Sequence, residues 1–389
     1  MSPDAPPAES RDLRICFAIE TLQIGGAETH AVALAEHLVN RGWTVGFAVM
    51  REAGPLAERC EKAGIRVQEH LMKSRRGLEV VRRFERLADS WRFGVLFVVE
   101  CFYINALLAY RAARSVLGCR AATIIHNMPS SREFSNPAIF RLRVGLMESL
   151  FDRVVFVAER QRRHYDEKLG VRFPRSVVIP NGVDVERFAP APLPVEAPEG
   201  DGRRYRVGIV GSFQPRKGHE FFLRAAARVR EHRSDVEFLI IGDGPRRPEL
   251  EQAAHNLGLG RTVHFLGNRE DVPDLLRTLD LVVLSSHEPE GGHAETLPLV
   301  LLEAGATGLP VVATDVGAVS DLVVEGETGF VVAQRDYAGI AHRIERLLNE
   351  PELRRSMGVN ARARILEQFN AAPMYRRFED LFLTGNIKE

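Results

Sequence analysis

The sequence has 389 residues, of which 45% are hydrophobic and 27% are charged. This length predicts two domains, and the apolar content, with only 32 glycines and 21 prolines, excludes a disordered or collagen-like chain. The 52 basic residues balance the 52 acidic ones, so no overall field would attract nucleic acid, and we expect no nucleic-acid partner.

The two halves of the chain nevertheless carry opposite charge. Residues 1–188 contain 28 basic and 22 acidic residues, whereas residues 189–389 contain 24 and 30. Three interpretations stay open: the halves attract each other, the basic half faces an anionic surface, or solvated faces merely differ.

Cysteine usage and the N-terminal residues indicate the compartment. Cys16, Cys60, Cys101 and Cys119 form no CxxC pair and are typical of small buried groups in a reducing environment. Residues 1–12 are polar and proline-rich, which predicts a disordered tail rather than a signal peptide. No uncharged apolar run reaches the ~18 residues of a membrane-spanning helix. We therefore expect a cytoplasmic protein.

Short apolar runs alternate with helix-length segments in the first half. The runs predict strands, which are at 13–19, 43–50, 94–100, 120–126, 153–158 and 176–180. Strands spaced in this way favour a parallel sheet covered by helices on both faces. The sequence thus predicts a Rossmann-like domain over 13–188, followed by a proline-rich linker over 189–204.

A second series of the same kind follows the linker. Its expected strands are at 205–211, 236–242, 261–267, 279–286 and 309–314, and residues 351–383 have helical spacing. The expected architecture is α/β, with a second doubly wound domain over 205–370 and a C-terminal helix over 371–389 that could cross back to the first domain. Ligands of such sheets bind outside the carboxyl ends of the strands, so we expect the site in a cleft between the domains.

Two strand-to-helix turns could hold an anion. Gly25 and Gly26 allow positive φ and close backbone approach before a helix, although a plain tight turn explains them equally well. Ser212, Arg216 and Lys217 follow the first strand of the second series, where a cation could neutralise a diphosphate. A solvated basic surface is the alternative.

Residues 284–314 contain the densest polar pattern of the chain. Thr296 is expected to cap a helix that begins near Pro298, and Glu295 precedes that cap. Glu303 lies in an otherwise apolar run, where a carboxylate needs partners or costs several kcal/mol. The structural alternative for Glu295 is a carboxylate that favours the helix dipole.

Taken together, these segments resemble glycosyltransferase family 4, whose members retain the anomeric configuration of the sugar. The resemblance covers roughly residues 13–370. It rests on GGAE (25–28), VIPNGVDVERF (178–188), GSFQPRKG (211–218), IGDGP (241–245), the Glu295/Glu303 pair and DVGAVSDLVVEGETGFVV (315–332). It implies a GT-B fold, in which an acceptor-binding domain precedes a nucleotide-sugar-binding domain.

The resemblance also implies roles for individual residues. Lys217 would contact the donor diphosphate, Glu295 the transferred sugar, and His126 the sugar near the reaction centre; these three are the expected catalytic residues. Glu303 would hold the ribose hydroxyls. The other expected donor-binding residues are Gly25, Gly26, Ser212, Arg216, Thr296, Leu297 and Leu299.

Three features depart from the family pattern. Ser212 stands where an arginine is common, so Arg216 would replace that arginine in the phosphate clamp. Pro298 has no N–H to donate, so contacts to the sugar would depend on neighbouring backbone N–H groups. The segment 287–295 is longer than usual.

The function that follows is sugar transfer from a nucleotide-sugar donor to a glycan, lipid-linked or small-molecule acceptor in polysaccharide or glycoconjugate synthesis. No cofactor and no metal are expected, because basic side chains would stabilise the departing diphosphate. Two alternatives stay open: a nucleotide-sugar epimerase of the same fold, and a non-catalytic sugar-nucleotide-binding protein.

Two amphipathic stretches raise the question of membrane contact. Residues 72–92 combine arginines, among them Arg75, Arg76, Arg82 and Arg83, with apolar residues at helical spacing, and residues 135–153 form a second such stretch. Basic amphipathic helices dock on anionic lipid. The alternative is that both helices bury their apolar faces against their own sheet.

Overall fold

The computed structural model describes residues 14–73, 77, 79–100, 103–128, 137–191, 204–288 and 295–387. The chain divides into two compact units. Unit 1 comprises Met1–Asn127, Ser131–Pro180 and Pro373–Glu389, and unit 2 comprises Met128–Ser130 and Asn181–Ala372. The expected tail and most of the expected linker lie outside the described residues.

Unit 1 is built on a seven-stranded parallel sheet in the order β3-β2-β1-β4-β5-β6-β7. Its strands are β1 (Arg14–Ile19), β2 (Thr44–Val49), β3 (Arg66–Gln68), β4 (Val95–Val99), β5 (Arg120–Ile125), β6 (Arg153–Phe156) and β7 (Ser176–Val178). The six predicted strands are present. The sequence did not predict β3, because this short edge strand contains RVQ and has no apolar run.

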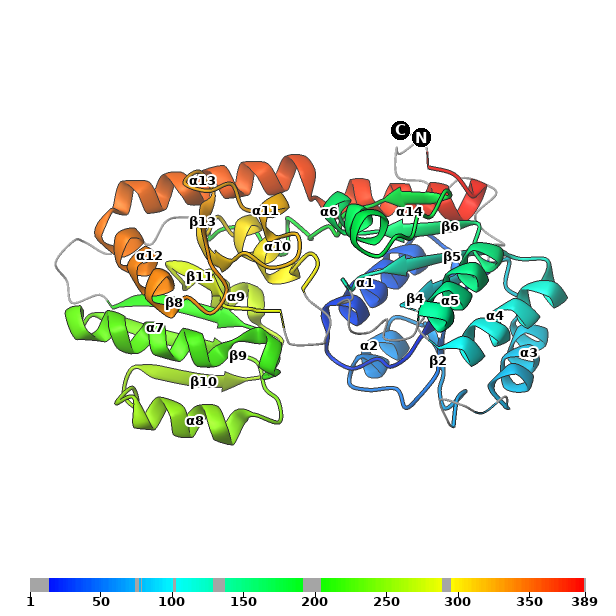
Figure 1. Ribbon diagram of the computed structural model, residues 1–389, viewed down its shortest axis with the longest axis horizontal. Coiled ribbons are helices and arrows are strands. Elements are labelled where there is room, and N and C mark those ends of the chain that lie inside the picture. Colours follow the sequence, from blue (N-terminus) through cyan, green and yellow to red (C-terminus); the bar gives the residue numbers. More distant parts are fainter. Residues whose placement is uncertain are drawn as a thin grey trace. The chain divides into compact units, whose positions relative to one another are not determined.

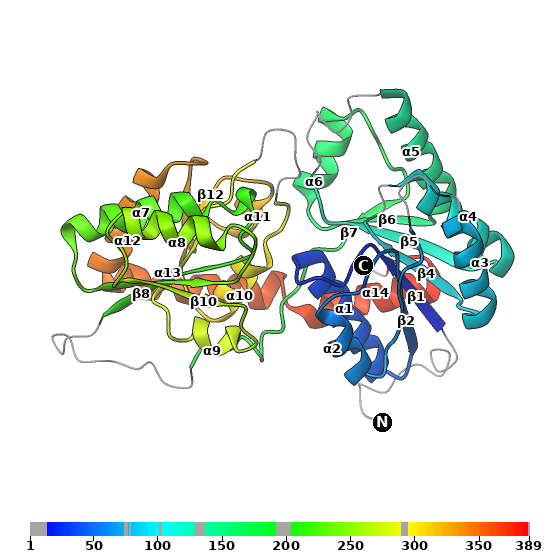
Figure 2. The ribbon, with the colours of Figure 1, turned by 90° about the horizontal axis from the view of Figure 1, so that it is seen from below.

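Helices cover both faces of this sheet (Figures 1 and 2). They are α1 (Gly26–Asn40), α2 (Leu56–Lys62), α3 (Glu79–Trp91), α4 (Ile104–Leu117), α5 (Pro137–Leu150), α6 (Glu159–Arg163), the π-helical turn η3 (His164–Lys168) and α14 (Ala371–Thr384). On one face, α3, α4 and α5 bury residues such as Phe84 and Tyr110 against the strands. On the other, Phe378 and Phe382 of α14 contact Phe97 of β4, so the end of the chain helps to close the core of unit 1.

Unit 2 repeats the plan with a six-stranded parallel sheet in the order β10-β9-β8-β11-β12-β13. Its strands are β8 (Tyr205–Val210), β9 (Val236–Ile241), β10 (Val263–Gly267), β11 (Leu281–Leu284), β12 (Val311–Thr314) and β13 (Gly329–Val332). The five predicted strands are present, and β13 is an additional edge strand of four residues. The predicted fold class, two doubly wound α/β domains, is therefore confirmed.

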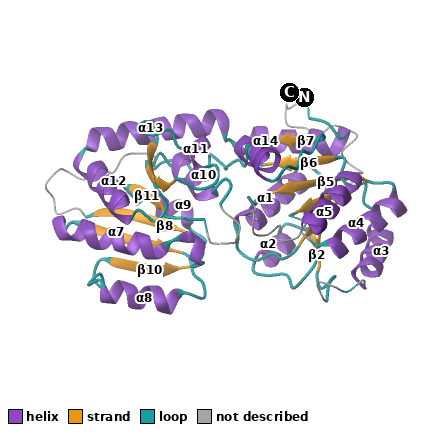
Figure 3. Cartoon of the chain, in the orientation of Figure 1, coloured by secondary structure: helices purple, strands orange, loops and turns teal. Residues whose placement is uncertain are grey.

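The helices of unit 2 enclose its sheet (Figure 3). They are the 3-10 turn η4 (Pro215–Lys217), α7 (His219–His232), α8 (Arg247–Asn256), α9 (Val272–Leu276), α10 (Leu299–Ala306), α11 (Val319–Leu322), α12 (Tyr337–Asn349) and α13 (Pro351–Gln368). None of the helices in the described part of the chain has the length and apolar character needed to cross a membrane.

The helical tail is interrupted between α13 and α14. The N–H of Val183 donates to the carbonyl of Phe369 at 2.9 Å, and the N–H of Ala371 donates to the carbonyl of Val183 at 3.0 Å. The backbone groups of residues 369 and 371 thus form hydrogen bonds with Val183 instead of continuing a helix. The predicted helical stretch 351–383 is thus two helices.

Each sheet has a point where the strand order reverses. In unit 1 this point lies between β1 and β4, and in unit 2 it lies between β8 and β11. In open parallel sheets, ligands bind beyond the carboxyl ends of the strands at such points. The loops after β1, β4, β8 and β11 are consequently the places to look for a site.

Candidate functional site

The loop after β8 is held in one conformation by its neighbours. Residues Pro215–Lys217 form η4, and Gly218 ends it with a φ of 64°. Ser285, beyond β11, donates from Oγ to the carbonyl of Gly218 at 2.8 Å, and the N–H of His287 donates to the carbonyl of Arg216 at 2.9 Å. These bonds fix Lys217 relative to the end of β11.

Lys217 forms an ion pair with Glu295 through Nζ and Oε1. Nη1 of Arg216 lies 3.9 Å from the same oxygen, and only 9% of the Glu295 side chain is exposed. Burial pushes the pKa of Glu295 upward, but the positive charges of Lys217 and Arg216 outweigh burial and hold its pKa below the ordinary value. The structure thus brings together three predicted residues, two partly exposed cations and the buried carboxylate of Glu295.

The helix that follows Glu295 begins later than predicted. Pro298, with extended backbone, is the N-cap of α10, so the expectation that Thr296 caps this helix is wrong. The preceding carbonyls have other partners: Thr296 O accepts from the N–H of Ala318 at 2.8 Å, and Leu297 O accepts from Nδ2 of Asn181 at 3.3 Å. These bonds hold residues 296–297 in a bend ahead of the helix.

Glu303 lies in the middle of α10. Burial raises its pKa to about 7, and the charge of Arg187 opposes the rise. Within the described residues its carboxylate has no hydrogen-bond partner. The Glu303 side chain is partly exposed, and its carboxylate, once ionised, can accept hydrogen bonds from hydroxyl donors.

The glycines after β1 do not use positive φ. Gly25 has a φ of −152° as the extended N-cap of α1, and Gly26 begins that helix. The positive φ that these glycines would allow is therefore not used. An N-cap residue with extended backbone already has the conformation that the start of a helix requires. A Cβ at Gly25 would lie 2.3 Å from Oε2 of Glu28, so the carboxylate of Glu28 in the first turn of α1 occupies that space.

His126 follows β5 in unit 1 and packs against a second histidine, His30 of α1. Their ring centroids are 5.1 Å apart, and Nε2 of His30 lies 3.2 Å from the sulfur of Met374. Burial, with a smaller effect of His30, holds the pKa of His126 well below its ordinary value, and burial lowers the pKa of His30 to about 4. Both rings are therefore neutral near pH 7.

Sequence reasoning missed two histidines at these loop ends. His30 sits on the buried face of α1, where a histidine looks like any other helix residue in a single sequence. His287 follows β11 and is buried, and its Nδ1 has no hydrogen-bond partner among the described residues. The sequence feature that could have indicated His287 is its position directly after a predicted strand.

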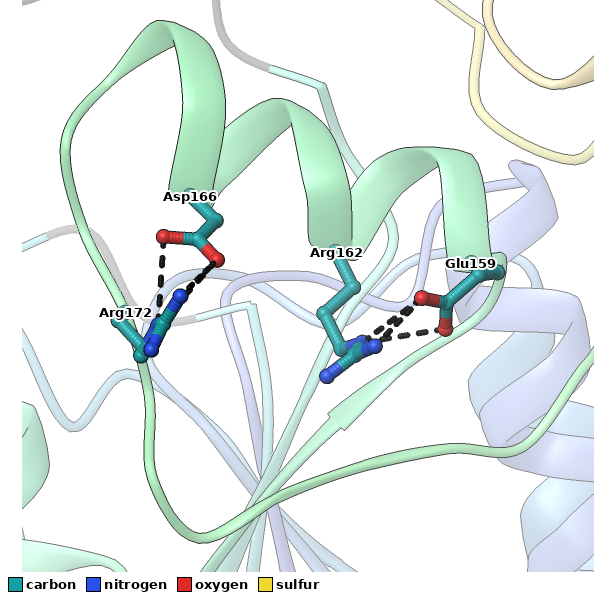
Figure 4. Close-up of polar contacts among 4 residues, drawn as sticks. All are labelled: Glu159, Arg162, Asp166 and Arg172. Atoms are coloured by element: carbon teal, nitrogen blue, oxygen red, sulfur yellow. Dashed lines mark hydrogen bonds and ion pairs between the residues drawn. The ribbon is translucent and has the colours of Figure 1, made fainter.

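No group of three or more His, Cys, Asp or Glu residues in the described ranges could hold a metal ion. A cavity of about 330 Å³ in unit 1 is lined by Phe156, Arg162, Asp166, Val171, Arg172, Phe173, Pro174 and Ser176. Figure 4 shows its arginines paired with carboxylates, Arg162 with Glu159 at 3.1 Å and Arg172 with Asp166 at 3.1 Å. None of the predicted site residues lines it.

Two protein-family models match most of the chain. The model described as Glycosyltransferase Family 4 matches residues 24–187, and the model described as Glycosyl transferases group 1 matches residues 196–364. The first match lies in the first half of the sequence and the second in the second half, as the resemblance in the sequence implied.

Individual proteins are similar over shorter stretches. N-acetyl-alpha-D-glucosaminyl L-malate synthase of Bacillus anthracis is 35% identical over 173 residues, which are 44% of each chain. The UDP-Gal:alpha-D-GlcNAc-diphosphoundecaprenol alpha-1,3-galactosyltransferase of Escherichia coli is 30% identical over 218 residues, 53% of each chain. The matched segments thus span about half the length of these relatives.

Among solved structures, Anabaena Alr3699/HepE in complex with UDP and glucose is similar along nearly the whole length. The TM-score is 0.79 at 22% identity, and the match covers 96% of this chain and 100% of that one. At this identity the likeness establishes the fold.

Proposed function

We propose that this chain, which belongs to glycosyltransferase family 4, transfers a sugar from a nucleotide-sugar donor to an acceptor. The observation that carries the proposal is the cluster that Lys217 and Arg216 form around the buried Glu295 carboxylate, at the strand-order reversal of unit 2. Cations fixed at that place can neutralise a diphosphate, and a carboxylate beside them can accept sugar hydroxyls. The unpartnered Glu303 carboxylate supplies an acceptor for ribose hydroxyls.

The proposed reaction retains the anomeric configuration. The bond between the sugar C1 and the diphosphate oxygen breaks, and the acceptor oxygen bonds to C1 on the same face. The acceptor proton passes to the departing phosphate. Lys217 stabilises the charge that develops on that phosphate, so the proposal needs no metal. Turnover should persist in EDTA, and the anomeric coupling in the NMR spectrum of the product should match that of the donor. Inversion of that coupling would contradict the retaining reaction.

The decisive experiment offers a panel of UDP-, GDP- and ADP-sugars with and without an acceptor extract. A transferase releases nucleoside diphosphate and forms a glycosylated product only when acceptor is present. An altered sugar nucleotide formed without acceptor would identify an epimerase. Tight nucleotide binding without any turnover would identify a binding protein.

The acceptor class that we propose is a glycan or a lipid-linked molecule, and the name of the Escherichia coli relative, which gives a diphosphoundecaprenol acceptor, supports this choice. Peripheral contact with anionic membrane is part of the same proposal. Val80, Phe84 and Leu87 of α3 are buried in unit 1, so the apolar face of that helix is occupied, and Arg75 and Arg76 lie outside the described residues.

Of the helices in the two amphipathic stretches, α5 is the one with exposed large apolar residues. Ile139 is 43% exposed and Leu142 is 54% exposed, with Arg141 exposed between them. Co-sedimentation with anionic vesicles tests this contact: it should weaken with salt and fall in Arg141→Ser/Leu142→Ser. Equal sedimentation with neutral vesicles would contradict it.

A further inference from the structure

The loop that carries His126 is held by two side chains from other elements. Glu100, directly after β4, accepts the backbone N–H of His126 through Oε1 at 3.2 Å and Nδ2 of Asn127 through Oε2 at 2.7 Å. Gln161 of α6 donates from Nε2 to the carbonyl of Ile125 at 2.8 Å and to that of Asn127 at 3.1 Å. The backbone groups on both sides of His126 are therefore fixed.

Each of these two side chains is itself fixed. Gln161 is fully buried, and its Oε1 accepts the N–H of Val157 at 2.9 Å, so its amide cannot turn without losing three bonds. Glu100 has a φ of 53°, in the left-handed region that a residue with a side chain rarely adopts. Its N–H donates to the carbonyl of Ile124 at 3.1 Å, which ties it to β5.

The imidazole of His126 depends on this support. Nε2 is buried and has no hydrogen-bond partner among the described residues, so no bond at that nitrogen fixes the angle of the ring. Its direction is set by the backbone at residues 125–127 and by packing against His30. Strained backbone persists where the surroundings over-determine it, and such strain is concentrated at functional sites.

We propose that Glu100 and Gln161 are positioning residues that aim His126 at the transferred sugar. The proposal rests on the proposed function and on the role that the family resemblance implies for His126, contact with the sugar near the reaction centre. It assigns neither residue a contact with the substrate. Misplacing a reacting group by about 1 Å can cost on the order of 100-fold in rate.

Two variants, Glu100→Gly and Gln161→Met, test the proposal, and they differ in their effects on the backbone. Glycine relieves the backbone strain at position 100, so that variant should stay folded while it loses the carboxylate. We expect kcat to fall by about 10- to 100-fold in each variant, with the donor KM unchanged. The matched control is Glu69→Gly, because Glu69 follows β3 at the carboxyl ends of the same sheet, and its carboxylate accepts the backbone N–H of Ala53 at 2.6 Å instead of that of His126.

The background of His126→Ala separates positioning from general support of the fold. There, Glu100→Gly and Gln161→Met should lower kcat no further, because the group that they aim is gone. Independent, multiplying losses of kcat would overturn the proposal, as would a control that loses as much as the two variants.

A readout without activity distinguishes failure of this proposal from failure of the proposed function. The His126 ring signals in NMR spectra of the full chain should shift or broaden in Gln161→Met and stay unchanged in Glu69→Gly. A wild-type protein without turnover on any donor would contradict the proposed function alone. Unchanged His126 signals in Gln161→Met would contradict the positioning role.

Discussion

Glu303 combines a burial cost with an expected binding role. Its carboxyl has a pKa of about 7 in the folded chain, so the carboxylate that accepts ribose hydroxyls is fully formed only above that pH. We expect the affinity for nucleoside diphosphate, measured by calorimetry, to fall as pH is lowered from 8 to 6. Glu303→Gln should bind about 10- to 100-fold more weakly at pH 8 and show a flat pH profile. A variant with the pH profile of the wild type would contradict the role.

The same residue should cost stability above neutral pH. Its folded pKa is raised from 4.5, so its contribution is fully present below about pH 4.5 and is lost as pH rises through 7. Glu303→Gln should therefore increase the free energy of unfolding at pH 8, by on the order of 1–3 kcal/mol. Glu352→Gln, at an exposed side chain, is the control and should change it by less than about 0.5 kcal/mol. Equal effects of the two variants would show that burial is not the cause.

Lys217 is expected to contribute both to stability and to catalysis, and a double-mutant cycle can separate the two contributions. Lys217→Met leaves the buried Glu295 with only the more distant Arg216 as a cation, and should lower the free energy of unfolding by roughly 3 kcal/mol. Lys217→Met/Glu295→Met removes both charges and should recover most of that loss in denaturant unfolding. Turnover should stay low in both variants, because the diphosphate has lost its cation. Recovery of turnover in the double variant would contradict the catalytic assignment.

The loop between β8 and α7 depends on one glycine. Gly218 has a φ of 64°, and a Cβ there would lie 2.0 Å from the carbonyl oxygen of Ser285. Gly218→Ala should shift the loop, lower turnover and destabilise unit 2. Gly258→Ala is the matched control, since Gly258 has a φ of 71° but nothing within 4 Å of the added carbon, so it should cost only about 1 kcal/mol. Denaturant unfolding and turnover of both variants check this. Equal losses of stability and turnover would mean that the strain of alanine at positive φ, and not the contact with Ser285, is the cause.

Apolar periodicity predicted the long elements because each buries a continuous face. It failed at β3 and β13, whose pairing depends on neighbouring strands more than on their own residues. It also failed at the start of α10, because the partners of the Thr296 and Leu297 carbonyls come from distant positions, Ala318 and Asn181.

The same limit applies to the candidate site. Motifs named Lys217 and Glu295 separately, and only the fold shows that they form one ion pair. The supports of His126 could not be predicted, since Glu100 and Gln161 belong to no motif and act through backbone groups of another element. Side-chain chemistry is visible in a sequence, whereas the pairing of a side chain with distant backbone is not.

At the scale of the whole molecule, each unit buries a histidine that stays neutral. Burial lowers the pKa of His30 in unit 1 to about 4 and that of His219 in unit 2 to about 3. In the unfolded chain these two histidines become protonated near pH 6.5, whereas in the folded chain they stay neutral. The free energy of unfolding therefore falls as pH drops from about 6.5 toward 4. Both units should therefore become acid-labile in the range where an exposed histidine merely becomes charged.

Unit 1 allows a direct measurement because both tryptophans of the chain, Trp43 and Trp91, lie in it. Tryptophan fluorescence during denaturant unfolding should show a free energy lower at pH 4.5 than at pH 7. His30→Leu should reduce that difference by roughly 2–3 kcal/mol, since leucine has no proton to gain. His70→Leu is the control, because the His70 side chain is 67% exposed and should leave the difference unchanged. If His30→Leu keeps the full acid sensitivity, the proton uptake that destabilises unit 1 occurs at groups other than this buried histidine.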